Sequence, residues 1–424
     1  MTARQSWAGV VAVVAVLGVG LSGCSGASAP GDGGGAAIEV DAATSPADQP
    51  VHLRVTGLAA DEEVTVTSAA TDYAGEQWKG NAVFRADGHG TVALDSAVPL
   101  SGTYRTADGM GLFWSMEPPT GDPDRSSFAP AFPEAQPSYD VRIGVTAHGR
   151  QVAARTLSRR FVGDGVSSRE LTVAADQVSG ELFLPPAGGP EHPAVLLFGG
   201  SEGGNAEKHA AALLASHGYP ALALGYFALP GLPATLHDIP LEYFVTAARL
   251  LAAQPGVDPA HVVTLGYSRG SEAALLLGED YPALIHGVIV YSPSAQANGS
   301  VPDGAAAWTR DGRPVAQETI PLDQVDGPVL ALAGADDRLW KSPSWARQID
   351  QELGAAKNSH PHRAMVYPDA GHGVGTFPYL PAGTRTVSRA GGSVLDLGGT
   401  RAGNAAAKAD GWPEVLALLA TLTA

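Results

Sequence analysis

The stretch Gly266-Tyr267-Ser268-Arg269-Gly270 lies between an apolar segment and a segment rich in alanine and leucine. Residues 261–265 are apolar and β-branched, as in a buried strand. Residues 272–277 favour a helix. A G-x-S-x-G sequence at a strand-to-helix junction predicts a nucleophile elbow, in which the glycines permit a tight, strained turn that exposes the serine hydroxyl. Ser268 is therefore the candidate nucleophile, and the alternative is a plain glycine-rich turn.

The other members of a catalytic triad are expected downstream, in the order serine, acid, histidine. Residues 329–334 predict a buried strand, which is followed by Asp336 and Asp337 on a loop where a carboxylate can orient an imidazole. Asp337 fits the usual G-x-x-D spacing, and Asp336 is the reserve. His372 follows a short predicted strand and lies between two glycines, where its ring can take the serine proton. The alternatives are a solvated acidic turn and a histidine without a catalytic role.

An oxyanion hole is expected after an earlier strand of the same sheet. Residues 193–198 predict an apolar strand, and the glycine-rich stretch 199–204 leads from it into a helix. The backbone N–H groups of Gly200, Ser201 and Arg269 are the predicted oxyanion donors. The competing interpretation is a phosphate-binding loop, but the stretch lacks both Gly-Lys-Ser/Thr and G-x-G-x-x-G. Nucleotide binding is therefore not expected.

Composition restricts the possible partners. The chain has 43 acidic and 26 basic residues, a net charge of −17 that disfavours nucleic acid or an anionic membrane surface as a partner. The sequence has no C-x-x-C and no H-E-x-x-H, so no metal or other cofactor is predicted. The net charge does not exclude a small-molecule substrate as the partner.

The N-terminus has the features of an export signal. A charged start precedes an apolar run over residues 8–21, which is too short for a comfortable membrane span. Leu21-Ser22-Gly23-Cys24 resembles a bacterial lipobox, which predicts lipidation of Cys24 and a protein anchored to the cell membrane, facing outward, through that lipid alone. The alternatives are an ordinary signal peptide and an N-terminal anchor helix. Because Cys24 is the only cysteine, no disulfide or thiol nucleophile is expected in the folded part.

Four parts are predicted along the chain. They are a lipoprotein signal peptide (1–24), a disordered tether (25–49), an Ig-like β-sandwich (50–165) and an α/β-hydrolase domain (166–424). Short segments of period-two alternation indicate the sandwich, and alternating strand and helix patterns indicate a mostly parallel sheet with flanking helices. A C-terminal helix is expected over residues 413–422, and the glycine-rich stretch between His372 and Asp410 is expected to be a loop near the active-site mouth. Four aromatic side chains of the sandwich are expected in its core: Trp78, Phe84, Phe113 and Trp114.

Both predicted domains resemble the acyl-CoA thioesterase and bile-acid-CoA:amino-acid N-acyltransferase family. In the second domain the resemblance is carried by Leu241-Glu242-Tyr243-Phe244, the serine motif with its following Ser271-Glu272, and the run from Gly334 to Ser342 that contains D-D-x-x-W-K-S. Residues 367–372 and 399–413 continue it. In the first domain, residues 50–58 and 110–118 match.

The resemblance implies a Ser268–His372–Asp337 triad that acts on thioesters of acyl-CoA type. The amino-acid-conjugating branch of the family uses a cysteine nucleophile, and this chain has a serine, so water is the expected acyl acceptor. Two further functions stay open: an exported carboxylesterase or lipid esterase of the same fold, and a non-catalytic surface-binding lipoprotein. The export signal keeps the first open, and a complete triad argues against the second.

Overall fold

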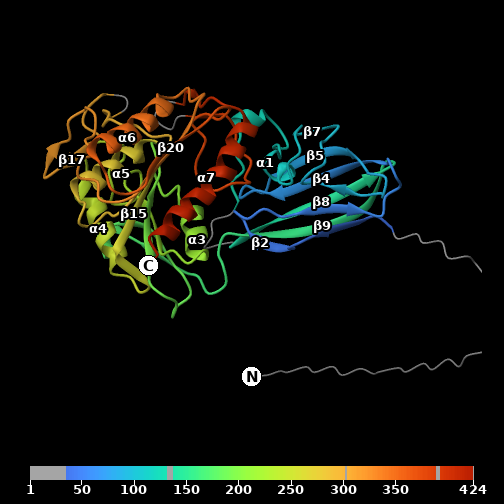
Figure 1. Ribbon diagram of the computed structural model, residues 1–424, viewed down its shortest axis with the longest axis horizontal. Coiled ribbons are helices and arrows are strands. Elements are labelled where there is room, and N and C mark those ends of the chain that lie inside the picture. Colours follow the sequence, from blue (N-terminus) through green and yellow to red (C-terminus); the bar gives the residue numbers. More distant parts are fainter. Residues whose placement is uncertain (1–34, 131–136, 301–302, 388–391, 424) are drawn as a thin grey trace, which may run out of the picture. The chain divides into compact units, whose positions relative to one another are not determined.

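A computed structural model describes residues 35–130, 137–300, 303–387 and 392–423. The predicted signal peptide, Cys24 and residues 25–34 of the predicted tether lie outside the described residues. Within the described part of the chain, no helix is both long enough and apolar enough to span a membrane. Figure 1 shows an N-terminal part built of strands and a C-terminal part in which helices flank a sheet.

The N-terminal part contains two sheets. The larger has six strands in the order β2-β9-β8-β4-β5-β7, and the smaller has three in the order β1-β3-β6. The predicted core aromatics Trp78, Phe84, Phe113 and Trp114 are all buried. The strands are β1 (Ala37–Val40), β2 (Thr44–Pro46), β3 (Leu53–Thr56), β4 (Glu63–Thr71), β5 (Gln77–Arg85), β6 (Val92–Ala93), β7 (Ser101–Gly102), β8 (Ser138–Ala147) and β9 (Arg150–Arg160), with short helices α1 (Gly111–Trp114) and η1 (Pro123–Arg125).

The disordered tether predicted over residues 25–49 is too long, because part of it is folded. Strand β1 pairs with β3, and β2 pairs with β9, so residues 37–40 and 44–46 belong to the two sheets rather than to a disordered segment. Ile38 and Ala47 are buried in the same core. These strands have four and three residues, too few for a period-two pattern to stand out in a stretch rich in small residues. Their stability comes from pairing with strands distant in sequence.

The C-terminal part is built on an eight-stranded sheet with the order β10-β11-β13-β12-β15-β16-β19-β20. From β13 to β20 in this order, neighbouring strands pair in parallel, while β11 pairs antiparallel with both β13 and the edge strand β10. The strands are β10 (Ser167–Leu171), β11 (Ser179–Leu184), β12 (His192–Phe198), β13 (Ala221–Gly225), β15 (Val257–Tyr267), β16 (Val288–Tyr291), β19 (Val329–Gly334) and β20 (His362–Tyr367).

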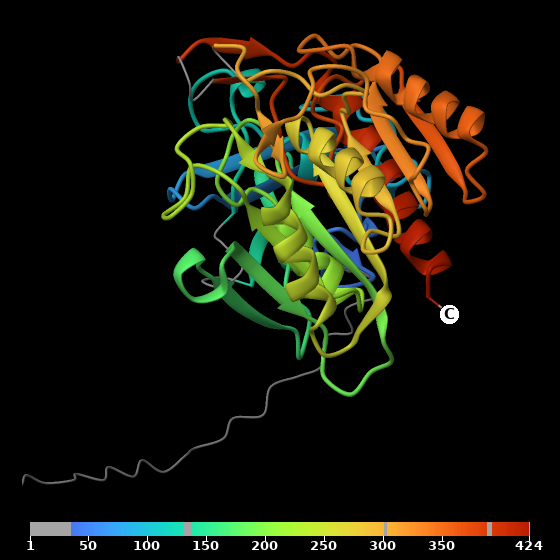
Figure 2. The same cartoon turned by 90° about the vertical axis from the view of Figure 1, so that its left-hand side faces the viewer.

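Helices cover both faces of this sheet, as Figures 1 and 2 show. Side chains alternate between two cores: Val263 and Leu265 of β15 pack with the residues of α3, and Val262 packs with those of α4, α5 and α6. Because both faces are covered, the central strands β13, β16 and β19 carry no charged residue and are buried along their whole length. The helices are α2 (Val173–Asp176), α3 (Lys208–Ser216), α4 (Leu241–Ala252), α5 (Arg269–Asp280), α6 (Ser342–Ala356) and α7 (Arg401–Thr421).

Asp48 joins the two parts. Its Oδ2 accepts hydrogen bonds from Trp412 Nε1 at 2.7 Å and from His217 Nε2 at 2.6 Å. In addition, Arg401 donates to the backbone oxygen of Met116 at 2.6 Å.

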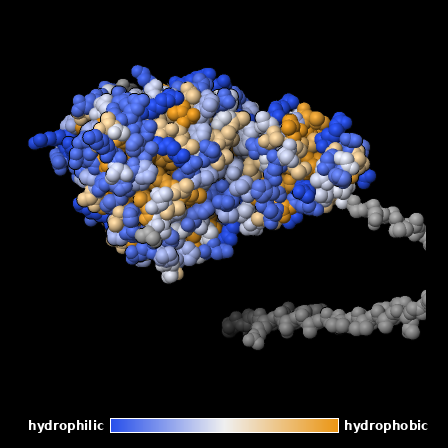
Figure 3. All heavy atoms as spheres, in the orientation of Figure 1, coloured by the Kyte–Doolittle hydropathy of each residue, from blue (hydrophilic) through white to orange (hydrophobic). Residues whose placement is uncertain are grey.

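On the face drawn in Figure 3 hydrophilic residues predominate, and hydrophobic residues form small groups. The smaller strands are β14 (Ile239–Pro240), β17 (Trp308–Arg310), β18 (Arg313–Pro314), β21 (Arg385–Val387) and β22 (Val394–Asp396).

Candidate active site

Ser268 occupies the turn between β15 and α5, where the sequence predicted it. Its φ of 53° and ψ of −119° place a non-glycine residue in a strained backbone conformation. The two motif glycines permit this tight turn, as expected, while the strained backbone angles themselves fall on the serine. A Cβ on Gly266 would lie 2.3 Å from the oxygen of Gly270, and one on Gly270 would lie 2.4 Å from the oxygen of Gly199. The glycines therefore allow strand, helix and loop to approach closely.

His372 lies on the loop that follows β20. Its backbone oxygen accepts hydrogen bonds from the hydroxyls of Tyr267 at 2.9 Å and Ser292 at 2.7 Å, and its N–H donates to Leu397 O at 2.7 Å. The imidazole packs edge-on against Tyr267 and Trp340, with ring centroids 5.5 and 5.7 Å away. These contacts fix both the backbone and the ring of His372.

Asp337 follows β19, and four groups donate to its carboxylate. Oδ1 accepts the backbone N–H groups of Leu339 at 2.9 Å and Trp340 at 3.2 Å. Oδ2 accepts the hydroxyl of Ser342 and Nδ1 of His372, the latter at 2.8 Å. The side chain of Asp337 is fully buried, so each of these bonds acts in a poorly screened environment.

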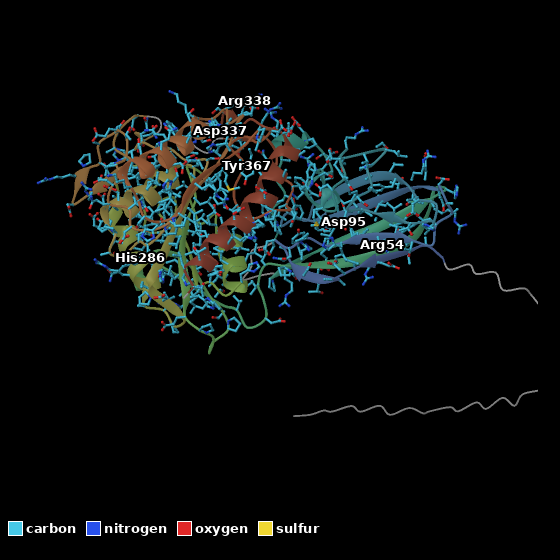
Figure 4. The ribbon with its side chains drawn as sticks, in the orientation of Figure 1. Arg54, Asp95, His286, Asp337, Arg338 and Tyr367 are labelled. Atoms are coloured by element: carbon cyan, nitrogen blue, oxygen red, sulfur yellow. The ribbon has the colours of Figure 1, made fainter. Side chains whose placement is uncertain are left out.

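The three predicted triad residues form one hydrogen-bonded row. His372 Nε2 lies 2.9 Å from Ser268 Oγ, and His372 Nδ1 lies 2.8 Å from Asp337 Oδ2. A carboxylate can only accept, so Nδ1 carries the proton and Nε2 is left to accept the serine proton. Asp337 and His372 follow the ends of the neighbouring strands β19 and β20, where Gly334 pairs with Tyr367; Figure 4 labels Asp337 and Tyr367. The row thus lies at the carboxyl end of the parallel sheet.

Asp336, the alternative candidate for the triad acid, directs its carboxylate toward Gly399 and Arg338 instead of His372. Its Oδ2 accepts the N–H of Gly399 at 2.9 Å and lies 3.0 Å from the guanidinium of Arg338. The bond from Gly399, and then the one from Arg338, lower the pKa of its carboxyl. Its side chain is 44% exposed. Asp336 therefore has its own partners, and only Asp337 reaches the imidazole.

The segment after β22 ties the acid loop to the histidine loop. Leu397 accepts the N–H of His372, Gly398 forms a bridge with Asp337, and Gly399 forms one with Ala370. From its glycine content this region was expected to be a loop near the active-site mouth. Strands β21 and β22 form a hairpin that precedes this segment. The pairing of residues 397–399 with the two loops has no signal in the sequence, because it is made by backbone groups.

Two of the three predicted oxyanion donors, Gly200 and Arg269, lie beside Ser268. A Cβ on Gly200 would lie 2.7 Å from Ser268 Cβ, so Gly200 borders the serine directly. Its N–H donates to Oε1 of Glu202 at 2.7 Å. Ser201 is exposed in the turn. Arg269 is the first residue of α5, where a backbone N–H has no acceptor within its helix. The proximity of Glu202 to Ser268 was missed, because its side-chain position depends on the loop geometry.

A buried ion pair in the first turn of α5, directly after Ser268, was also not predicted from the sequence. Arg269 Nε lies 3.0 Å from Glu272 Oε1, and both side chains are almost fully buried. Trp308 Nε1 donates to Glu272 Oε2 at 2.7 Å, and Asn298 Nδ2 donates to Oε1 at 2.9 Å. The guanidinium of Arg269 donates to the backbone oxygens of Asn298 and Gly299, each at 2.8 Å. The network anchors the first turn of α5 to the neighbouring loop.

These features define an α/β hydrolase that follows an N-terminal β-sheet domain. The family region described as "Acyl-CoA thioester hydrolase/BAAT N-terminal region" matches residues 48–173, and "BAAT / Acyl-CoA thioester hydrolase C terminal" matches residues 295–423. The chain belongs to the acyl-CoA thioesterase and bile-acid-CoA:amino-acid N-acyltransferase family, whose thioesterase members are hydrolases. The resemblance drawn from the sequence motifs is confirmed.

Similarity to individual thioesterases extends over nearly the whole length of both chains. Acyl-coenzyme A thioesterase 6 of Mus musculus is 31% identical over 397 residues, which cover 87% of this chain and 92% of that protein. Acyl-coenzyme A thioesterase 1 of Rattus norvegicus is 30% identical over 396 residues, with the same coverage of 87% and 92%. Acyl-coenzyme A thioesterase 6 of Homo sapiens is 29% identical over 398 residues.

Proposed function

We propose that this protein is a serine-dependent hydrolase of acyl thioesters of the acyl-CoA type, with Ser268 as nucleophile, His372 as general base and Asp337 as the orienting acid. The observation that carries the proposal is the row of hydrogen bonds from Ser268 Oγ through the imidazole to Asp337 Oδ2, at 2.9 and 2.8 Å. The thioesterases that are similar to it over 87% of this chain supply the substrate class.

In the first half of the reaction, Ser268 Oγ attacks the thioester carbonyl while Nε2 of His372 takes its proton. The resulting imidazolium is stabilised by the buried carboxylate of Asp337, whose other three donors hold it in place. The negative charge on the carbonyl oxygen is received by backbone N–H groups, for which Arg269 and Gly200 are the candidates. Collapse of this intermediate expels the thiolate, which His372 protonates.

In the second half, water attacks the acyl-serine ester. His372 removes a proton from the water, and the acid leaves as Ser268 recovers its proton. A serine ester is less reactive toward amines than the thioester that a cysteine nucleophile would form. The only cysteine of the chain is Cys24, far from the serine motif in sequence. Hydrolysis is therefore proposed in preference to conjugation with an amino acid.

The direct test is labelling with a fluorophosphonate, which reacts with activated serines, followed by product analysis. The parent protein is expected to label at Ser268, and Ser268→Ala is expected to lose labelling and nearly all turnover of acyl-CoA. With glycine or taurine present, mass spectrometry is expected to show mainly free acid. Residual activity of Ser268→Ala within about tenfold of the parent would contradict the nucleophile assignment. A predominance of amide conjugate would contradict the choice of water as acceptor.

We also propose that the protein is exported and anchored by a lipid on Cys24. The support is the sequence alone: a short apolar run that ends in Leu21-Ser22-Gly23-Cys24. Cys24→Ala is expected to shift the protein from the membrane fraction to the soluble fraction, or to leave it unprocessed, with unchanged specific activity of the folded part. Membrane retention with normal signal cleavage would contradict the lipid anchor.

A further inference from the structure

The loop after β12 carries a carboxylate of its own next to Ser268. The N–H of Gly200, one of the predicted oxyanion donors, donates a 2.7 Å hydrogen bond to Oε1 of Glu202. An ideal Cβ on Gly200 would lie 3.0 Å from the other carboxylate oxygen, Oε2, and 3.2 Å from Ser268 Oγ. The side chain of Glu202 therefore interacts with the donor that borders the nucleophile.

The loop is shaped to accommodate this carboxylate. A Cβ on Gly199 would lie 2.1 Å from Glu202 Oε1, so a larger residue there would collide with it. The hydroxyl of Tyr226 lies 2.9 Å from the carbonyl oxygen of Gly199. Because the C=O and N–H of a trans peptide point in opposite directions, this contact turns the N–H of Gly200 away from Tyr226 and toward Glu202.

The charge of Glu202 raises the pKa values of buried groups around it. Burial raises the pKa of Tyr267 well above its usual value, and the charge of Glu202 raises it further. The same two causes, in the same order, raise the pKa of Glu207. An oxyanion formed at Ser268 would meet the same negative charge in a poorly screened site. It would also need the N–H that Glu202 already uses.

We propose that Glu202 is a built-in occupant of the oxyanion site, which the acyl substrate displaces before the tetrahedral intermediate forms. The inference rests on the proposed function, since it takes Ser268 as the nucleophile. Glu202 is in this view a positioning and specificity residue rather than a catalytic one. Acyl groups that bind well enough to move its side chain react, and weakly bound esters do not, because displacement is driven by binding energy from the rest of the substrate.

The experiment compares inhibition by an alkyl trifluoromethyl ketone in the parent, Glu202→Ala, Glu202→Gln and Glu191→Ala. In the inhibited enzyme Ser268 Oγ bonds to the ketone carbon, its proton moves to His372 Nε2, and the carbonyl oxygen becomes the oxyanion. Glu191 is exposed and precedes β12, at the opposite end of that strand from Gly199, so its variant controls for the loss of one negative charge. Fluorophosphonate labelling of Ser268 is measured in the same samples.

Glu202→Ala is expected to bind the ketone about tenfold or more tightly, because the N–H of Gly200 no longer has to give up a hydrogen bond to a charged acceptor. Glu202→Gln keeps the acceptor but loses the charge, and it is expected to fall between the parent and Glu202→Ala. It also provides the test if the alanine variant does not fold. Glu191→Ala is expected to match the parent.

Unchanged or weaker ketone binding by the folded Glu202 variants would overturn the inference, provided that the parent labels with the fluorophosphonate. A parent that does not label would overturn the proposed function itself, together with everything that rests on it. The two failures are therefore distinguishable in one set of samples.

Discussion

The hydroxyl of Ser342 donates a hydrogen bond to Oδ2 of Asp337, the same oxygen that accepts Nδ1 of His372. Ser342 is the first residue of α6 and is completely buried. Oδ2 of Asp337 is thereby held between the imidazole of His372 and the hydroxyl of the first residue of α6. The orientation of His372 depends on this arrangement, because a carboxylate that can rotate no longer fixes the ring.

Ser342→Ala is expected to lower kcat by about tenfold with little change in KM, because a hydrogen bond to a charged group contributes on the order of 1.5 kcal/mol or more. Steady-state kinetics on an acyl-CoA substrate measures both parameters. Ser344→Ala, an exposed serine in the same helical turn, is the matched control and is expected to behave like the parent. Equal kcat values for the two variants would show that Asp337 is held adequately by its backbone donors.

Asp337→Asn is expected to lower kcat by roughly three to four orders of magnitude, because an amide no longer imposes the imidazole tautomer in which Nε2 accepts. Asp336→Asn is expected to stay within a few-fold of the parent, since Asp336 pairs with Gly399 and Arg338 instead of His372. Rates of the two variants under identical conditions give the comparison. The opposite order would transfer the role of acid to Asp336.

Glu272→Gln is expected to destabilise the protein by about 3 kcal/mol or more, because it leaves the buried guanidinium of Arg269 without its counter-charge. The free energy of unfolding from urea denaturation measures the effect. Glu318→Gln replaces an exposed carboxylate and is expected to change stability by less than about 0.5 kcal/mol. A Glu272 variant as stable as this control would show that the ion pair contributes nothing net.

Glu207 is expected to make stability depend on pH near neutrality. Burial, and then the charge of Glu202, raise the pKa of this carboxyl to about 7, while Lys408 and Thr376 oppose the shift. Between its ordinary pKa and 7 the folded state binds this proton more strongly than the unfolded state does. The contribution to the free energy of unfolding is therefore lost as the pH rises through that window.

Glu207→Gln removes this titration. The stability of the variant relative to the parent is expected to increase as the pH is raised from about 5 to about 7, whatever the offset between them. Urea denaturation across that range measures the difference, with Glu318→Gln as the control that is expected to run parallel to the parent. Parallel curves for Glu207→Gln would show that its pKa is not raised in the folded protein.

Much of the fold could be predicted because its signals are local. The predicted strand at 261–265 lies inside β15, and the predicted helix at 272–277 lies inside α5. The C-terminal helix was predicted from Pro413 but begins at Arg401, where Thr400 caps it by accepting the N–H of Gly403 at 2.9 Å. Proline is common in the first turn of a helix, so Pro413, which lies inside α7, is a misleading signal for where this helix starts.

The sequence alone determined the elbow, the order of serine, acid and histidine, and the family, since each can be recognised from short local motifs and their order along the chain. The tertiary structure decided between Asp336 and Asp337. Gly399, about 60 residues away in sequence, holds the carboxylate of Asp336, whereas His372, on the loop after β20, holds that of Asp337. The tertiary structure also placed Glu202 on the N–H of Gly200. Adjacent carboxylates have the same chemistry, so only their surroundings in space can give them different roles.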